Sequence, residues 1–441
     1  MIAADDISAG LPDRVMRKAQ WRLLPLIFLA YLIAIVDRLN ISFAAATMNA
    51  DLGFTATVYG LAGGIFFVSY ALLEVPSNMA MMRFGSRIWL TRIMITWGLI
   101  SAAQMFVQTP MQFYVLRFLL GAAEAGFFPA ILFYASLWFP AKWRGRAISR
   151  FYVAQPVSQI LMGLVSGPIL GLDGMSGLQG WQWLFLLEAI PAILMGIIIF
   201  KFLPDGPAVV SWLEPDERQW LTGALATDEG AITSTKHDSV MRAIADKPVL
   251  LFGLVWFFYV GAVNAFYVSA PQILGLKTGL GTQGVGLLVA AGGVLGAFAL
   301  IGLGWHSDRR QERFWHILAP AIMVAASIAT LATGPSPALA ALAALTLAVT
   351  WLPSQPVFFS ALSETLHERH RAVGVAAVNT FGQFGSFLSI SAFGVAKDAT
   401  GTYDLGLAAM AVSVVIGAGI LNHIRRAAQR KTLPQAVTSS A

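Results

Sequence analysis

The chain has 441 residues, of which 57% are hydrophobic and only 12% are charged. Soluble globular proteins carry roughly twice that charged fraction, so the composition excludes a soluble globular domain, a coiled coil and a disordered chain. What remains is a membrane protein with many spans, because this length holds about ten to twelve helices of about 20 apolar residues with their loops.

Twelve apolar stretches of spanning length follow one another along the chain. Helices are the expected spanning element, because each helix satisfies its own backbone hydrogen bonds in lipid. The first stretch carries no small-residue cleavage site, so we expect it to be retained rather than removed as a signal peptide. We therefore predict an all-α polytopic membrane protein with spans at residues 22–43, 57–82, 87–107, 111–138, 147–171, 182–203, 248–270, 282–305, 314–333, 337–358, 372–395 and 404–424.

The basic residues orient these spans. With the N-terminus placed in the cytoplasm, 25 of the 29 Lys and Arg residues lie in cytoplasmic segments, and only Lys277 and Lys397 lie outside. This bias predicts that both termini are cytoplasmic. The basic residues form no patch interleaved with aromatic residues, so we expect no nucleic acid partner. The chain has no cysteine and no phosphate loop, and we expect no cofactor and no metal.

A long polar segment at 204–246 divides six spans from six. The two sides share local sequence, since Arg144–Ala147 (RGRA) and Arg369–Ala372 (RHRA) follow the fourth and tenth spans at an offset of 225 residues. A repeat of this kind indicates a duplicated six-helix unit. We therefore predict a first bundle at 1–203, a cytoplasmic linker at 204–246 and a second bundle at 247–441, with a substrate site between the bundles.

Several short motifs fit a known transporter family. Gly304–Arg309 (GWHSDR) lies between the eighth and ninth spans, and Asn78–Arg87 (NMAMMRFGSR) is its counterpart, with Met82 where the general motif has Asp. Asp37–Asn40 (DRLN) and Arg117–Phe139 (RFLLGAAEAGFFPAILFYASLWF) are more specific. On these motifs the chain resembles the major facilitator superfamily and, within it, the anion:cation symporter family of bacterial organic-anion transporters.

Ionisable side chains within the predicted spans are the candidate functional residues. A charge at the bilayer centre costs at least about 2.5–3.5 kcal/mol, so each of them is expected to face a cavity or a partner. Glu74 and Glu188 lie nearer helix ends, where packing or gating is expected. The group consists of Asp37, Arg38, Glu74, Arg117, Glu124 and Glu188.

The resemblance implies a role for four of these residues. Arg38 and Arg117 would bind a substrate carboxylate, which a guanidinium holds through two parallel hydrogen bonds. Asp37 and Glu124 would carry protons, because desolvation makes a carboxylate easier to protonate. The alternative is structural: Asp37 and Arg38 would form static salt bridges, and Glu124 would be a buried partner of Arg117, seven residues before it on the same helix face.

Polar and aromatic residues on the expected cavity faces complete the candidate substrate site. Tyr70, Gln155 and Asn379 match substrate-lining positions of the family that the chain resembles, and Asn264 and Tyr267 are the other candidates. Ordinary interhelical hydrogen bonding is the alternative for all five.

A separate charged set is expected to latch the cytoplasmic mouth rather than to bind substrate. It comprises Arg83, Arg87, Arg144, Arg146, Asp308, Arg309 and Arg371.

These observations predict a proton-coupled secondary transporter that imports a small organic anion, such as tartrate, a sugar acid or an aromatic acid, across a bacterial cytoplasmic membrane by alternating access. Its expected partners are the anion, protons and the lipid bilayer, and its expected state is a monomer. An organic-anion uniporter or antiporter and a membrane receptor derived from a transporter are the alternatives. We do not expect an enzyme, because the sequence offers no catalytic dyad or metal set.

Overall fold

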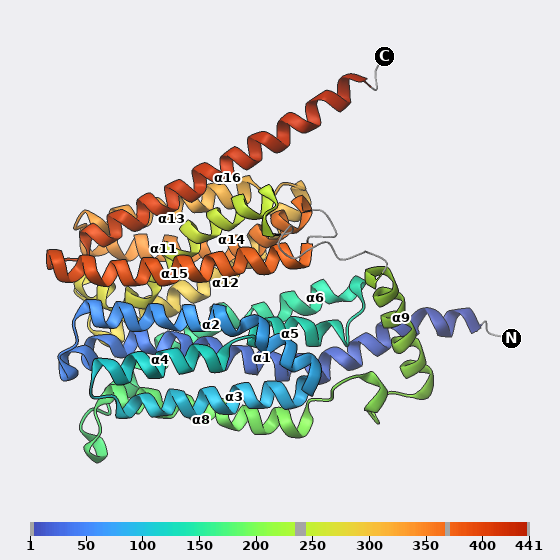
Figure 1. The fold of residues 1–441 in the computed structure, drawn as a ribbon, viewed down its shortest axis with the longest axis horizontal. Helices are drawn as coiled ribbons and strands as arrows, with labels where there is room; N and C mark the ends of the chain where they lie inside the picture. The colour runs from blue at the N-terminus through green and yellow to red at the C-terminus, as the bar shows by residue number, and fades with distance from the viewer. Residues whose placement is uncertain (1–3, 234–243, 367–370, 439–441) are drawn as a thin grey trace.

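Long helices running side by side make up the protein (Figure 1). The computed structural model describes residues 4–233, 244–366 and 371–438, and every regular element in these ranges is a helix. The first bundle contains α1 (Ala4–Leu52), α2 (Ala56–Phe84), α3 (Ser86–Ala103), α4 (Pro110–Glu124), α5 (Phe127–Ser136), α6 (Ala141–Tyr152), α7 (Ala154–Leu170) and α8 (Gly180–Phe202). After α9 (Pro215–Thr233), the second bundle contains α11 (Lys247–Thr278), α12 (Thr282–Arg310), α13 (Trp315–Ala332), α14 (Pro337–Thr365), α15 (Arg371–Thr400) and α16 (Asp404–Thr438).

The all-α polytopic architecture is confirmed. In the described ranges, 11 helical stretches are long and apolar enough to cross a membrane, and two of these stretches join consecutive helices, α4 with α5 and α6 with α7. The remaining predicted span, 87–107, corresponds to α3, which packs lengthwise against α8 (Figure 1). α3 is not among the 11 because its 18 residues include Arg87 and Arg92, which lower its apolar content.

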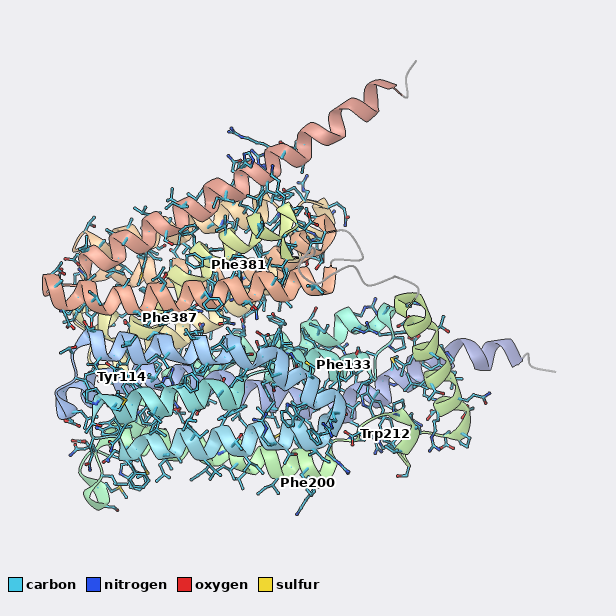
Figure 2. The ribbon with its side chains drawn as sticks, in the orientation of Figure 1. Tyr114, Phe133, Phe200, Trp212, Phe381 and Phe387 are labelled. Atoms are coloured by element: carbon cyan, nitrogen blue, oxygen red, sulfur yellow. The ribbon has the colours of Figure 1, made fainter. Side chains whose placement is uncertain are left out.

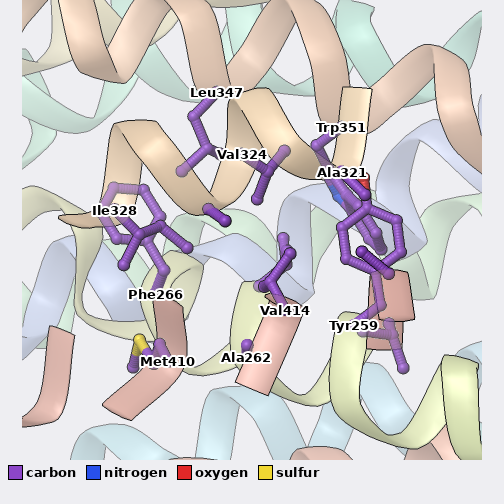
Figure 3. Close-up of a cluster of buried hydrophobic side chains, with 14 of the residues drawn as sticks. Tyr259, Ala262, Phe266, Ala321, Val324, Ile328, Leu347, Trp351, Met410 and Val414 are labelled. Atoms are coloured by element: carbon purple, nitrogen blue, oxygen red, sulfur yellow. The ribbon is translucent and has the colours of Figure 1, made fainter. Parts of the chain in front are cut away.

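Each bundle buries its own apolar core. The core of the second bundle draws on α11, α13, α14 and α16, and Figure 3 shows Phe266 and Trp351 within it. The first bundle holds two clusters, one within residues 15–221 and one within residues 36–185. Large apolar side chains also point outward, as Phe200 does from α8 (Figure 2). An outer surface of this kind suits lipid rather than water.

The polar segment between the bundles contains α9, which is anchored to α1. The buried Glu217 carboxylate accepts hydrogen bonds from Lys18 Nζ at 2.8 Å and from Arg14 Nε at 2.9 Å. Burial opposes the ionisation of Glu217, but the hydrogen bonds from Lys18 and the Glu214 backbone, together with the charges of Lys18 and Arg14, outweigh it and lower the pKa of Glu217. Trp212, which is labelled in Figure 2, stacks on Trp138 with ring centres 5.5 Å apart. The described part of this segment is therefore packed against the first bundle.

The two bundles touch along α2 with α15 and along α7 with α12. A Cβ atom on Gly60 would lie 2.8 Å from the Ile390 carbonyl oxygen, and one on Gly394 would lie 2.2 Å from the Ala56 carbonyl oxygen. These distances leave no room for a side chain, so the helix backbones are in direct contact. We call the end of the molecule where α2 begins and α15 ends the closed end.

An acidic side chain of the second bundle caps a helix of the first at the closed end. The Asp398 carboxylate accepts hydrogen bonds from the backbone N–H groups of Ala56 at 3.0 Å and Thr57 at 2.7 Å. The N-terminus of a helix carries partial positive charge, so a carboxylate is favoured there. Nearby, the Tyr59 hydroxyl donates to the Val268 carbonyl oxygen at 2.7 Å, which adds a second link between the bundles.

We expect Asp398→Asn to weaken the closed end. The amide has no negative charge and offers one acceptor oxygen in place of the two that the Ala56 and Thr57 N–H groups use, and losing a charged hydrogen bond costs roughly 1.5–3 kcal/mol. The population with separated bundle ends should rise about tenfold or more.

Spin labels can report the distance between the two bundles at the closed end. Because the chain has no cysteine, they can be placed on cysteines introduced at Ala50 and Thr402. Asp13→Asn, an exposed carboxylate change, should leave the distance unchanged. An unaltered distance distribution in Asp398→Asn would show that the backbone contacts alone hold this end.

Candidate functional site

Arg38 on α1 and Glu124 at the end of α4 form an ion pair. Arg38 Nε lies 2.7 Å from Glu124 Oε2. The Arg38 side chain is 35% exposed and that of Glu124 is 1% exposed, so a solute can reach the guanidinium while the carboxylate lies behind it. Two of the predicted functional residues are thus in direct contact. Glu124 pairs with Arg38 rather than with Arg117, its neighbour on the same helix.

Phe66 of α2 lies against both predicted substrate-binding arginines. The guanidinium carbons of Arg117 and Arg38 lie 4.8 and 5.6 Å from the centre of its ring, and Arg38 also lies 4.9 Å from the centre of the Tyr70 ring. Arg117 is buried, and its Nε and Nη1 have no hydrogen-bond partner among the described residues. A guanidinium with unused donors beside a second guanidinium is chemically suited to a carboxylate.

The helix is interrupted directly after Glu124. α4 ends at this residue, Ala125 leaves the helical conformation, and Gly126 adopts a left-handed conformation with φ of 83°. Pro129 favours the break, because it has no N–H to donate to the Ala125 carbonyl. A Cβ on Gly126 would lie 2.6 Å from Ser77 Oγ. The fourth predicted span is therefore two helices, and Glu124 stands at a helix end inside the span, a position where discontinuous membrane helices can place binding groups.

Asp37, the other predicted proton carrier, is fully buried. Its Oδ1 accepts hydrogen bonds from Ser101 Oγ at 2.5 Å and from Asn40 Nδ2 at 3.3 Å. Its Oδ2 has no hydrogen-bond partner among the described residues. Of the two predicted proton carriers, Glu124 therefore contacts an arginine directly, and Asp37 contacts α3.

The remaining predicted substrate residues are distributed between the bundles. Gln155 Nε2 donates to the Tyr31 hydroxyl at 3.1 Å within the first bundle, and Asn264 Nδ2 donates to Ser386 Oγ at 2.9 Å within the second. Tyr267 lines a cavity of about 40 Å³ between the bundles. Neither these two hydrogen bonds nor the lining of this cavity includes Arg38, Arg117 or Glu124.

Asn379 links the two bundles farther along α2, away from the closed end. Its Nδ2 lies 3.3 and 3.4 Å from the two carboxylate oxygens of Glu74, which is 7% exposed on α2. A predicted substrate residue and a predicted gating or packing residue are therefore partners. A cavity of about 640 Å³ lies at the closed end, lined by Tyr59, Gln272 and Asp398 among others, and not beside Arg38.

The predicted latch residues pair with neighbours outside their own set. Arg87 Nε lies 3.7 Å from Asp205, Arg144 Nη2 lies 3.5 Å from Asp228, and Asp308 lies 2.5 Å from Arg313. None of these three pairs joins two members of the set. Arg83 and Arg309 stack on the rings of Phe84 and Trp305, Arg146 is exposed, and the side chain of Arg371 lies outside the described residues.

Two contacts of the site were not anticipated from sequence. Phe66 precedes Tyr70 by four residues, one helical turn, so that spacing could have placed it on the same face. Ser101 lies on α3 and meets Asp37 only in the folded bundle, and no pattern in its own neighbourhood marks it.

Comparison with known proteins identifies relatives along the whole chain. Residues 27–390 match the family model described as Major Facilitator Superfamily. The sequence is 41% identical to a protein named "Putative tartrate transporter" from Agrobacterium vitis, over 93% of this chain and 91% of that protein. It is 34% identical to a protein named "Quinolone resistance transporter" from Acinetobacter baumannii, over 91% of this chain and 93% of that one.

The fold also has solved counterparts. The partially occluded inward open conformation of the xylose transporter XylE from E. coli superposes with a TM-score of 0.73 at 17% identity, covering 91% of this chain and 96% of that one. At this identity the similarity concerns the fold alone.

We expect Gly126→Ala to destabilise the protein by about 1–3 kcal/mol, because it puts a side chain on a left-handed residue and against Ser77 Oγ. Gly145→Ala is the matched control, since a Cβ on this residue of α6 meets nothing within 4 Å and alanine favours a helix over glycine. Thermal unfolding in detergent should give a lower midpoint for the first variant and an equal or higher one for the second. Equal midpoints for Gly126→Ala and the natural protein would show that the break after Glu124 is not required.

Proposed function

Because the chain belongs to the Major Facilitator Superfamily and is a secondary transporter, we propose that it imports a small organic anion together with protons. The observation that carries the proposal is the Arg38–Glu124 ion pair at 2.7 Å beside the unused donors of Arg117. One arginine is occupied by a carboxylate of the protein itself, and the other has free donors.

Protonation of Glu124 is the proposed coupling step. A neutral Glu124 no longer neutralises Arg38, so the two guanidiniums on Phe66 become available to one substrate carboxylate. Loss of the proton restores the ion pair and displaces the anion. Proton and anion therefore bind together and leave together, because the carboxylates of Glu124 and of the substrate compete for Arg38.

The substrate class follows from the chemistry of the site and from the relatives. Two arginines favour a carboxylate, which accepts two parallel hydrogen bonds from a guanidinium. Two relatives, 41% and 40% identical, carry the name "Putative tartrate transporter". We propose a small carboxylate of this type, with sugar acids and aromatic acids as the other members of the class. An organic-anion exchanger is the second candidate, because an incoming carboxylate could also displace an outgoing one from Arg38.

Rocking of the two bundles provides the proposed alternating access. The contacts of α2 with α15 and of α7 with α12 would separate at the closed end while the other end closes. We propose the bundle limits 1–203 and 247–441, a monomeric state, and a bacterial inner membrane with both termini cytoplasmic. The distribution of Lys and Arg residues supports this orientation.

Glu124→Gln separates coupled import from exchange. In proteoliposomes with an inward proton gradient, the natural protein should accumulate labelled tartrate. The variant should accumulate at least about tenfold less, because glutamine neither binds nor releases the proton, and it should retain tartrate exchange. Glu214→Gln, an exposed change in the linker, should behave as the natural protein. Accumulation that is independent of the gradient, or full accumulation by Glu124→Gln, would contradict proton coupling at this residue.

Arg117→Lys tests the carboxylate site. Lysine keeps the charge but lacks the planar pair of donors, so the affinity for tartrate or the best acid in a panel of carboxylic acids should fall at least about tenfold. Arg425→Lys, on α16 against Trp315 and Asn422, is the control and should keep the affinity. Binding is measured by the ligand-dependent shift of the unfolding temperature. An unchanged affinity in Arg117→Lys would assign this arginine to structure alone.

A further inference from the structure

A second group of buried polar side chains lies around Asp37 in the first bundle. It combines Asp37 and Asn40 of α1, Ser101 of α3 and Glu188 of α8. The first three side chains are fully buried, and Glu188 is 5% exposed. Glu188 faces both Asp37 and Asn40. The role proposed above for Glu124 does not use Glu188 at all.

Hydrogen-bond acceptors outnumber donors in this group. Ser101 and Asn40 both donate to the same oxygen, Asp37 Oδ1, at 2.5 and 3.3 Å. Asp37 Oδ2, Asn40 Oδ1 and both carboxylate oxygens of Glu188 have no hydrogen-bond partner among the described residues. A buried acceptor without a donor is unfavourable, and more so if it is charged. The group therefore requires an additional donor, and a proton on one carboxyl group supplies it.

Asp37 and Glu188 differ in how well their surroundings stabilise a negative charge. Two donors, Ser101 and Asn40, converge on Asp37 and favour its ionised form, whereas Glu188 faces the Asn40 amide without a hydrogen bond of normal geometry. Burial and the nearby Glu124 carboxylate act against a negative charge on Asp37, and Arg117 and Arg38, which also face it, act in its favour. An O–H group on Glu188 would find free acceptors in Asp37 Oδ2 and Asn40 Oδ1.

We propose that Glu188 and Asp37 form a buried carboxyl pair that shares one proton, carried mainly by Glu188, as a second proton-binding site distinct from Glu124. A metal cation suits the group less well, because the Ser101 hydroxyl hydrogen and the Asn40 amide hydrogens already point at Asp37 and would repel it. The pair communicates with the substrate site through Asp37, whose chain neighbour is Arg38. Its transport consequence, a further proton moved with each anion, rests on the proposed function.

Infrared spectroscopy of the purified protein tests the pair without any substrate. A protonated carboxyl group gives a carbonyl stretching band at neutral pH that shifts in D₂O. Glu188→Gln should remove a band of one carboxyl group from the spectrum, and Glu188→Asp should restore one. Asp37→Asn should shift the band, because the acceptor of the O–H changes. Glu214→Gln, on the protein surface, should leave the spectrum unchanged. An unchanged carboxyl band in Glu188→Gln, or its disappearance when Na⁺ replaces K⁺, would overturn the proposal.

Transport measurements separate this proposal from the proposed function. In proteoliposomes the number of protons moved per tartrate is measured for the natural protein and for Glu188→Gln, and we expect one fewer in the variant. If the natural protein moves no protons while the infrared band is present, the proton-coupled function fails and the carboxyl pair stands. If the natural protein moves protons and Glu188→Gln changes neither the band nor the ratio, the carboxyl pair fails and the proton-coupled function stands.

Discussion

The arrangement of the first bundle depends on the cost of burying charge. Four ionisable side chains, Arg38, Arg117, Glu124 and Glu188, face a fifth, Asp37, in a region where water does not solvate them fully. Their pairing limits that cost, but the close ion pair of Arg38 with Glu124 leaves Asp37, Arg117, Glu188 and Oε1 of Glu124 itself with unused hydrogen-bonding atoms. A site that is incompletely neutralised has the capacity to bind ions reversibly, because adding a proton or an anion improves its electrostatic balance.

Much of the fold could be predicted from sequence, because apolar stretches long enough to cross a membrane identify the spanning helices. The interruption after Glu124 could not be read from hydropathy, since the apolar stretch continues through it. It depends on the left-handed Gly126, on Pro129 and on the close approach of Ser77. The sequence of small residues followed by proline, GAAEAGFFP, is the local signal of this break.

The candidate site was predictable in its residue types but only partly in its partners. Intramembrane charge is rare, so Arg38, Arg117, Asp37 and Glu124 stand out in any sequence of this composition. Helical periodicity relates Arg117 to Glu124 along one helix, yet the partner of Glu124 comes from another helix. The same holds for Asn379 with Glu74, and for Asp398 with the start of α2. Partners between helices depend on tertiary packing, which a single sequence does not contain.

The glycines where α2 meets α15 have a kinetic consequence. Gly60 and Gly394 present bare backbone to the opposite helix, and Gly64 meets the Ser391 and Phe387 side chains, so few side chains have to be withdrawn before the helices part. The activation barrier for separating the bundles would then arise mainly from a few hydrogen bonds, such as those of Asp398, rather than from the rearrangement of side chains along the whole contact. A surface of this kind can open and close repeatedly without repacking a core, which suits a molecule whose turnover requires the same contact to break and re-form in every cycle.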